Sequence, residues 1–154
     1  MKARTTVLTL AMCLVAVAVC FAADSFTGTW KLNEGKSKLG AGVPKNTTVV
    51  YEAAGDNVKI TVEGTDSEGQ ATHNEWTGKF DGGDYPVTGD ATCDMRSYKK
   101  VDKHTLTFIG KKDGKEALSG RVVISADGKS RTVHVTATDS KGNKVRGTAV
   151  YDKQ

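Results

Sequence analysis

Apolar and polar residues alternate one by one along most of the chain after residue 22. Val58, Ile60 and Val62 are separated by polar residues, and residues 132–137 repeat this alternation. A period of two is typical of β-strands that bury one face. In this part of the chain apolar residues do not recur at helical spacing over a useful length, and Thr and Val are common. The pattern therefore predicts an all-β fold with almost no helix.

Polar turns that contain glycine interrupt the alternation at nearly even intervals, for example at residues 81–84, 112–115 and 126–129. Such turns join neighbouring antiparallel strands. Ten short strands joined in this way predict an antiparallel up-and-down β-barrel, because closing the meander leaves no exposed edge strand. The predicted strands are residues 27–33, 46–53, 57–64, 71–81, 84–88, 93–101, 104–110, 115–125, 130–138 and 144–152.

One hairpin pattern occurs twice in the chain. Residues 62–70 match residues 135–143 at an offset of 73 positions, and each copy contains an Asp-Ser-x-Gly turn. Because similar turn residues favour similar turns, we expect the two hairpins to share one register. Two copies are too few to indicate a repeat architecture.

The first 22 residues have the three parts of a secretory signal peptide. Lys2 and Arg4 make a basic start, residues 7–21 form an apolar run, and Cys20 and Ala22 offer small side chains at the −3 and −1 positions of a cleavage site. We expect removal of residues 1–22 or 1–23, export to the periplasm or the cell exterior, and a single domain over residues 23–154. The alternative is a lipoprotein acylated at Cys20, which Val19 disfavours because a small residue is normally required before that cysteine.

Composition and charge exclude several functional classes. The formal net charge of +4 falls to +2 without the signal peptide, and charges of both signs are interleaved, so no basic stripe exists for nucleic acid. No later apolar run has the length of a membrane span. Cys93 is the one cysteine after the signal peptide, which excludes an internal disulfide. We expect a monomer that is stabilised by packing.

The residue types that commonly carry catalysis or hold metals are scattered. His73, His104 and His134 lie on different predicted strands, and the chain has no Gly-x-Ser-x-Gly nucleophile turn. His73 and Glu75 share a strand face and could supply two metal ligands, with a third from the strand of His134, but a solvated polar face is the commoner reason for such a pair. We therefore expect no enzyme activity, no cofactor and no metal site.

Cys93 shares its strand parity with Met95, on the face that we expect to be buried. A lone buried cysteine usually packs as a small apolar residue. A reactive thiol would need a neighbouring cation, and Arg96 or Lys99 could provide it. We favour the packing role.

Arg131 is the most distinctive polar residue of the predicted strands. The alternation places it on the inward face with Val133 and Val135, near the mouth of the barrel. An inward guanidinium needs a partner, so Arg131 could anchor the polar or anionic head group of a ligand. Alternatively, its place at a strand end lets the side chain reach water, and we favour this second interpretation.

The two ends of the predicted barrel resemble those of a known superfamily. Residues 26–32, with the sequence Gly28-Thr29-Trp30, and residues 148–153 look like the first and last strands of the calycins, that is, the lipocalins and fatty-acid-binding proteins. The resemblance implies that Trp30 plugs the closed end of the barrel and that Gly28 lets the first strand bend. Over its whole length the chain is also similar to secreted bacterial lipocalin-like proteins, in which segments like residues 79–89 recur.

The chain departs from the fatty-acid-binding proteins at two places. Those proteins hold the ligand carboxylate with an Arg-x-Tyr pair on the last strand, and here Tyr151 matches the tyrosine while Ala149 stands at the arginine position. Their two-helix lid would have to lie within residues 34–45, whose glycines and proline do not favour helices. We therefore expect long-chain fatty acids to bind weakly.

These observations together predict a secreted, non-enzymatic barrel that binds a small amphipathic or apolar molecule. We expect a neutral or zwitterionic ligand whose apolar part packs on Trp76 and Phe108 and whose polar end lies near Arg131 and Tyr151. With few large apolar residues, the barrel is either narrow and filled or keeps a partly polar cavity. The alternative function is a structural or protein-interaction module of the cell envelope without a small-molecule ligand.

Overall fold

The structure, a computed structural model, describes residues 24–41, 43–66, 68–139 and 141–154. The predicted signal peptide, Cys20 included, lies outside the described residues. Within them, ten antiparallel strands form one closed β-barrel, and one short 3₁₀ turn, η1, spans Glu34–Lys36. The predicted all-β up-and-down barrel with almost no helix is confirmed. No helix in the described ranges has the length and apolar character needed to cross a membrane.

The strands follow the predicted ranges to within a few residues. The largest difference is at β4, which ends at Gly78 although the alternation continues, because the Asp81 carboxylate accepts a hydrogen bond from the Gly83 N–H and forms a turn there. The strands are β1 Gly28–Leu32, β2 Lys45–Ala54, β3 Asn57–Thr65, β4 Ala71–Gly78, β5 Tyr85–Thr88, β6 Met95–Asp102, β7 Thr105–Lys112, β8 Lys115–Ile124, β9 Ser130–Thr138 and β10 Lys144–Lys153.

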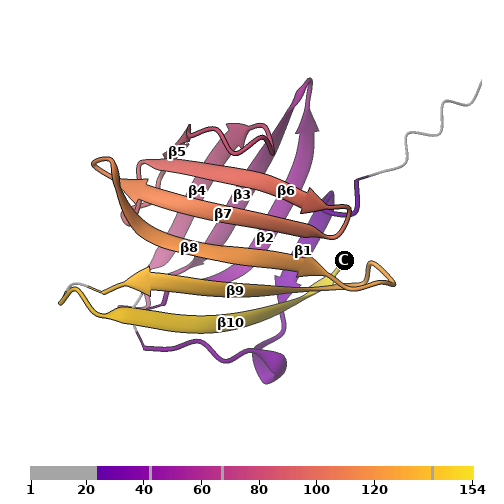
Figure 1. The fold of residues 1–154 in the computed structure, drawn as a ribbon. Coiled ribbons are helices and arrows are strands. Elements are labelled where there is room, and N and C mark those ends of the chain that lie inside the picture. The colour runs from indigo at the N-terminus through magenta and orange to yellow at the C-terminus, as the bar shows by residue number, and fades with distance from the viewer. Residues whose placement is uncertain (1–23, 42, 67, 140) are drawn as a thin grey trace, which may run out of the picture.

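The barrel closes because β1 pairs with both β2 and the end of β10 (Figure 1). β1 is short, and its ladder with β10 covers only Trp30 to Leu32. The chain after Leu32 continues alongside β10, where Lys38 forms an isolated bridge with Thr148. This segment therefore covers β10 before β2 begins, and it contains one helical turn where the fatty-acid-binding proteins have their two-helix lid.

The two matching hairpin turns have matching hydrogen bonds. The Asp66 N–H donates to the Gln70 carbonyl at 3.0 Å, and the Asp139 N–H donates to the Asn143 carbonyl at 2.9 Å. Each aspartate carboxylate also accepts two backbone N–H groups from its own turn. The repeated sequence therefore encodes a repeated turn, and both turns lie at the same end of the barrel.

Aromatic side chains fill the opposite, closed end of the barrel. Trp30 is fully buried, and its indole Nε1 donates a hydrogen bond to the Phe26 carbonyl at 2.9 Å. Phe26 packs edge-on against Phe80, which in turn stacks on Trp76 with ring centroids 6.2 Å apart. Gly28 has a φ of +121°, a backbone conformation that side chains disfavour, and allows the chain to bend from Phe26 into β1.

The inward face of β6 differs from the predicted one. Arg96 and Tyr98 point into the barrel, opposite Gly110 and Phe108 of β7, while Met95 begins the strand on the outer face. Cys93 is nevertheless buried because it lies before the strand, in the segment that connects β5 and β6. The predicted shared face of Cys93 and Met95 is wrong because Cys93 lies outside β6, so the alternation of that strand does not determine where its side chain points.

Candidate ligand-binding cavity

The half of the barrel away from Trp30 contains a cavity of about 220 Å³. The exposed residues Ala91 and Thr92 are part of its lining, so the cavity reaches the surface at the mouth of the barrel. Both apolar and polar side chains line it. Of the two alternatives left open by the sequence, the structure has the partly polar cavity.

Small residues on the inward faces leave the space for this cavity. At Gly120 of β8, a Cβ atom would come within 2.5 Å of the Phe108 ring, so the glycine makes room for that ring beside β8. Ala149 of β10 is buried in the lining where a larger side chain would fill the volume. The aromatic residues are concentrated at the closed end, and the small ones leave the other half open.

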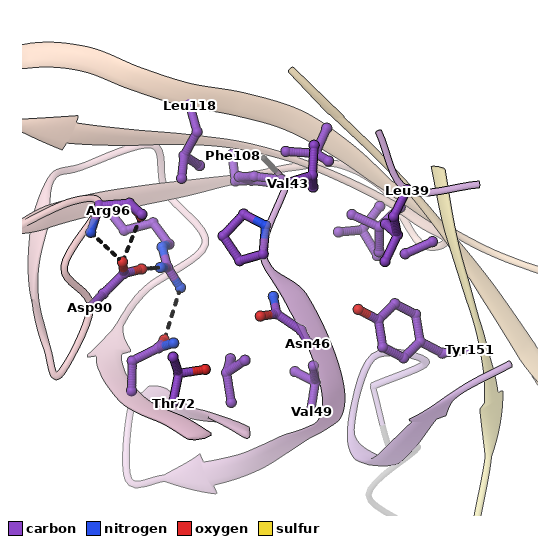
Figure 2. Close-up of a pocket in the computed structure, with 18 of the residues that line it drawn as sticks. Leu39, Val43, Asn46, Val49, Thr72, Asp90, Arg96, Phe108, Leu118 and Tyr151 are labelled. Carbon is purple, nitrogen blue, oxygen red and sulfur yellow. Dashed lines mark hydrogen bonds and ion pairs between the residues drawn. The ribbon is translucent and has the colours of Figure 1, made fainter. Parts of the chain in front are cut away.

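The mouth of the cavity has an apolar side and a polar side (Figure 2). Leu39 and Val43 contribute the apolar side from the segment between β1 and β2. Asp90 and Arg96 contribute the polar side, and Figure 2 shows them facing each other away from Tyr151. A molecule at the mouth would therefore meet apolar surface on one side and a paired charge on the other.

Arg96 and Asp90 form a buried ion pair in the cavity wall. Arg96 is 7% exposed, and it also donates a hydrogen bond to the Asn74 amide oxygen at 3.4 Å. Burial alone would raise the pKa of the Asp90 carboxyl, but hydrogen bonds from Thr92 and the Arg96 charge outweigh burial and lower it. The pair is thus charged on both sides. Sequence reasoning missed it, although the shared parity of Arg96 with Tyr98 was a usable signal.

Cys93 packs beside this ion pair. Its Sγ lies 3.3 Å from the Asp90 Oδ2 and 3.5 Å from an Arg96 nitrogen. Burial raises the pKa of the thiol, and the Arg96 charge, already paired with Asp90, does not reverse that shift. The residue therefore has the character of a packed thiol and not of an activated nucleophile.

Arg131 lies on the floor of the cavity, against the aromatic closed end. Its side chain is 3% exposed, and its Cζ lies 4.3 Å from the ring centroid of Tyr151, 5.2 Å from that of Tyr51 and 5.4 Å from that of Trp30. The favoured expectation that Arg131 reaches water near the mouth was wrong. Its β9 position pairs with the buried residues Ile124 and Tyr151 at the end of the sheet ladders, and this is the end of the barrel that Trp30 closes.

Tyrosine side chains surround this floor. Tyr51, Tyr98 and Tyr151 all line the cavity and are buried. Burial raises the pKa of Tyr98 to about 12 and also raises that of Tyr151, even though neighbouring arginine charges oppose the shift. Both pKa directions keep the hydroxyls of Tyr98 and Tyr151 protonated at neutral pH, so these two hydroxyls are available as hydrogen-bond donors.

The four residues proposed for ligand contact are not all brought together. Arg131, Tyr151 and Phe108 line the cavity. Trp76 does not, because its ring packs between Phe80 and Tyr98 in the aromatic cluster and its Nε1 donates to the Arg96 carbonyl at 2.8 Å. Contact of any of these residues with a ligand stays a prediction.

The histidines are dispersed over the barrel. His73 lies on the outer face, with its Nδ1 2.5 Å from Glu63 and its Nε2 3.7 Å from Glu75, and these acidic neighbours raise its pKa. His134 is on the outer face of β9 beside Thr148, and His104 is in the turn between β6 and β7. The strand of His134 therefore does not supply a third ligand next to His73. Within the described ranges, no group of three or more His, Cys, Asp or Glu side chains is arranged to hold a metal ion.

No protein-family model matches the chain, and no curated protein matches it. Among solved structures, the chain is similar to EF1p2_mFAP2b bound to DFHBI, with 11% identity, a TM-score of 0.51 and coverage of 86% of this chain and 97% of that chain. The redesigned beta barrel b11L5F_LGL has 14% identity and a TM-score of 0.49, with 88% and 97% covered. Lobster apocrustacyanin A1 has 13% identity and a TM-score of 0.43, with 86% and 62% covered. The likeness to EF1p2_mFAP2b shows the barrel fold alone.

Proposed function

We propose that this protein is a lipocalin-like member of the calycin superfamily that binds a small amphipathic or apolar molecule in its barrel cavity, without catalysing a reaction. The observation that carries the proposal is the cavity itself, which combines apolar walls with a few convergent polar groups. Cavities of this kind are the usual sites for small ligands. Burial of apolar ligand surface against Phe108 and its neighbours would supply most of the affinity.

The shape of the barrel supports binding at this place. Trp30 and Phe80 fill the closed end, so a ligand would have access only from the mouth beside Ala91 and Thr92. The similar barrel EF1p2_mFAP2b is described as bound to DFHBI. This chain's own lining residues, and not that likeness, are the reason for the proposal.

The test is uptake of the neutral apolar dye N-phenyl-1-naphthylamine, followed by its fluorescence. We expect the parent protein to bind the dye and the variant Ala149→Phe to lose binding, because the larger side chain would occupy the cavity. The matched control is Val150→Phe, which places the same ring on the other face of β10. Circular dichroism would show that both variants are folded.

Two outcomes would contradict the proposal. Dye binding that persists in Ala149→Phe would place the dye outside the cavity. Absence of uptake by the parent protein, together with no small molecule retained in native mass spectrometry of protein from its own host, would favour the structural or protein-interaction module of the cell envelope.

We also propose that the chain is exported as a monomer after loss of residues 1–22 or 1–23. The support is the basic start, the apolar run and the Ala22-Ala23 junction. N-terminal sequencing of exported material should begin at Ala23 or Asp24. A mature chain that begins at an acylated Cys20 would overturn this proposal and make the protein membrane-anchored.

A further inference from the structure

Arg131 is a buried cation without an anion. Its side chain is 3% exposed, its Nε has no hydrogen-bond partner, and among the described residues no carboxylate forms a salt bridge with it. Arginine stays protonated at any pH at which proteins are folded. Burial of a charge that is not paired strongly destabilises a folded protein. The floor of the cavity therefore has a positive charge that no acidic side chain in the described part of the chain compensates.

The second buried arginine of the cavity, Arg96, differs from Arg131 because it has a salt-bridge partner. Arg96 has Asp90 as a salt-bridge partner and Asn74 as a hydrogen-bond acceptor. Its Nε, like that of Arg131, has no hydrogen-bond partner, but its charge is neutralised within the wall by Asp90. An anion that reaches the cavity would be attracted to Arg131, beyond the neutralised pair at the mouth.

The aromatic rings around Arg131 stabilise its charge only in part. Cation–π contacts with Tyr151, Tyr51 and Trp30 offset some of the cost of burial, but none of these neutral side chains carries a negative charge to pair with the guanidinium. The tyrosine hydroxyls nearby are protonated at neutral pH and can donate to an anionic oxygen. The floor is therefore rich in donors, and no carboxylate of the described residues forms a salt bridge with its cation.

The volume of the cavity limits the size of a ligand that bears the anionic group. A cavity of about 150 Å³ holds a benzene molecule, and the volume here is about 220 Å³. The space therefore fits a molecule of one or two rings, with apolar surface for Phe108, Val122 and Val133. A long alkyl chain would extend out of the mouth.

We propose that the cavity selects a small, ring-sized organic acid whose carboxylate pairs with Arg131 on the cavity floor and whose apolar ring packs against the wall around Phe108. This inference rests on the proposed function and names the ligand class. It replaces the expectation of a neutral or zwitterionic ligand, because that expectation rested on Ala149 at the arginine position of the fatty-acid-binding proteins, and the structure has the Arg131 cation buried on the cavity floor.

The test compares two probes of nearly the same shape, 2-naphthoate and the neutral 2-naphthamide, by isothermal titration calorimetry at neutral pH. The parent protein should prefer naphthoate by roughly ten- to hundredfold, the range expected for a charged hydrogen bond in a buried site. This comparison needs no variant. Equal affinity for the two probes, or a preference for the amide, would overturn the proposal.

Variants then assign the preference to Arg131. Arg131→Gln should remove the preference because it weakens the binding of naphthoate much more than that of naphthamide, and Arg131→Lys should keep part of the preference. The matched control is Lys153→Gln, because Lys153 is an exposed cation whose Nζ lies 5.1 Å from the same Trp30 ring without lining the cavity. A folded Arg131→Gln variant that retains the full preference would overturn the proposal, because Arg131 would then have only a structural role.

The two proposals fail in distinguishable ways. If N-phenyl-1-naphthylamine binds but naphthoate shows no advantage over naphthamide, the binding function stands and the anion site is wrong. If neither the dye nor either naphthalene probe binds, both proposals are wrong.

Discussion

The indole of Trp30 has two cations near it. One is the buried Arg131 and the other is the exposed Lys153. The indole itself is fully buried and hydrogen-bonded to the Phe26 carbonyl. One side chain therefore closes the barrel, holds the N-terminal segment in place and supports the arginine on the cavity floor. Its contribution to stability should be that of a large core aromatic with a satisfied polar group.

Trp30→Ala should lower the free energy of unfolding by roughly 3–5 kcal/mol, the usual cost of truncating a buried aromatic residue. Urea denaturation followed by circular dichroism would measure the change. Val101→Ala, at an apolar side chain that is 53% exposed, is the control and should have almost no effect. If the urea midpoints of Trp30→Ala and the parent coincide, Trp30 does not plug the barrel.

Asp90→Asn should lower the free energy of unfolding at neutral pH by roughly 3–5 kcal/mol, because it leaves the buried Arg96 charge unpaired. Asp84→Asn removes an exposed ion pair with Lys111, 2.5 Å long, and should cost much less. Equal losses in the two variants would contradict the assigned role of Asp90.

The same pair predicts a pH dependence. The pKa of Asp90 is lowered in the folded state, so its contribution is fully present above the ordinary carboxyl pKa and is lost as the pH falls through the folded value. The stability difference between the parent and Asp90→Asn should therefore be constant near neutral pH and shrink as the pH falls below about 4. Urea denaturation across this range measures it, and a difference independent of pH would count against the charged pair.

At the scale of elements, the hairpin turns set the register of the barrel. The two Asp-Ser-x-Gly turns make equivalent backbone hydrogen bonds in different parts of the sheet, so their geometry comes from the local sequence. The turn between β9 and β10 ends with Gly142 at a φ of +83°, and a Cβ there would meet open space. Any cost of a side chain at this position therefore comes from the backbone conformation and not from crowding.

Gly142→Ala should destabilise the protein by roughly 1–2 kcal/mol, the cost of a left-handed conformation for an L-residue. Gly35→Ala is the matched control, because Gly35 has no positive φ and its Cβ would make an ordinary contact of 3.6 Å. Thermal unfolding of the two variants gives the comparison. Equal melting temperatures would mean that the turn relaxes to another geometry.

At the scale of the whole molecule, aromatic residues close one half of the barrel and small residues open the other. The cavity that results is about 220 Å³, and its floor is charged. The aromatic residues at the closed end therefore limit how far a ligand can enter the barrel. Arg131 favours a ligand whose polar group lies at the inner end of the cavity.

Oleate should bind weakly, more weakly than 2-naphthoate, because most of its chain would stay outside a cavity of this volume. Competition with bound N-phenyl-1-naphthylamine measures both affinities under the same conditions. Submicromolar oleate binding that survives Arg131→Ala would contradict both the size limit and the anion site.

The sequence by itself determined the fold. The period-two alternation and the glycine turns predicted ten strands and their closure, and the structure has them with small differences in their ends. These features are local: a turn such as residues 139–143 makes its hydrogen bonds within a few residues, and alternation along β3 follows from the geometry of one strand.

Only the tertiary structure decided where the charged residues lie and whether the barrel is hollow. Arg131 is buried because β9 pairs with Ile124 on one side and Tyr151 on the other, and Arg96 faces inward because β6 begins after Cys93. The cavity depends on which inward-facing residues are paired across neighbouring strands, such as Gly120 of β8 opposite Phe108 of β7. These pairings depend on the register between strands, and the space that remains depends on the summed volume of the inward side chains. The pattern of a single strand contains neither.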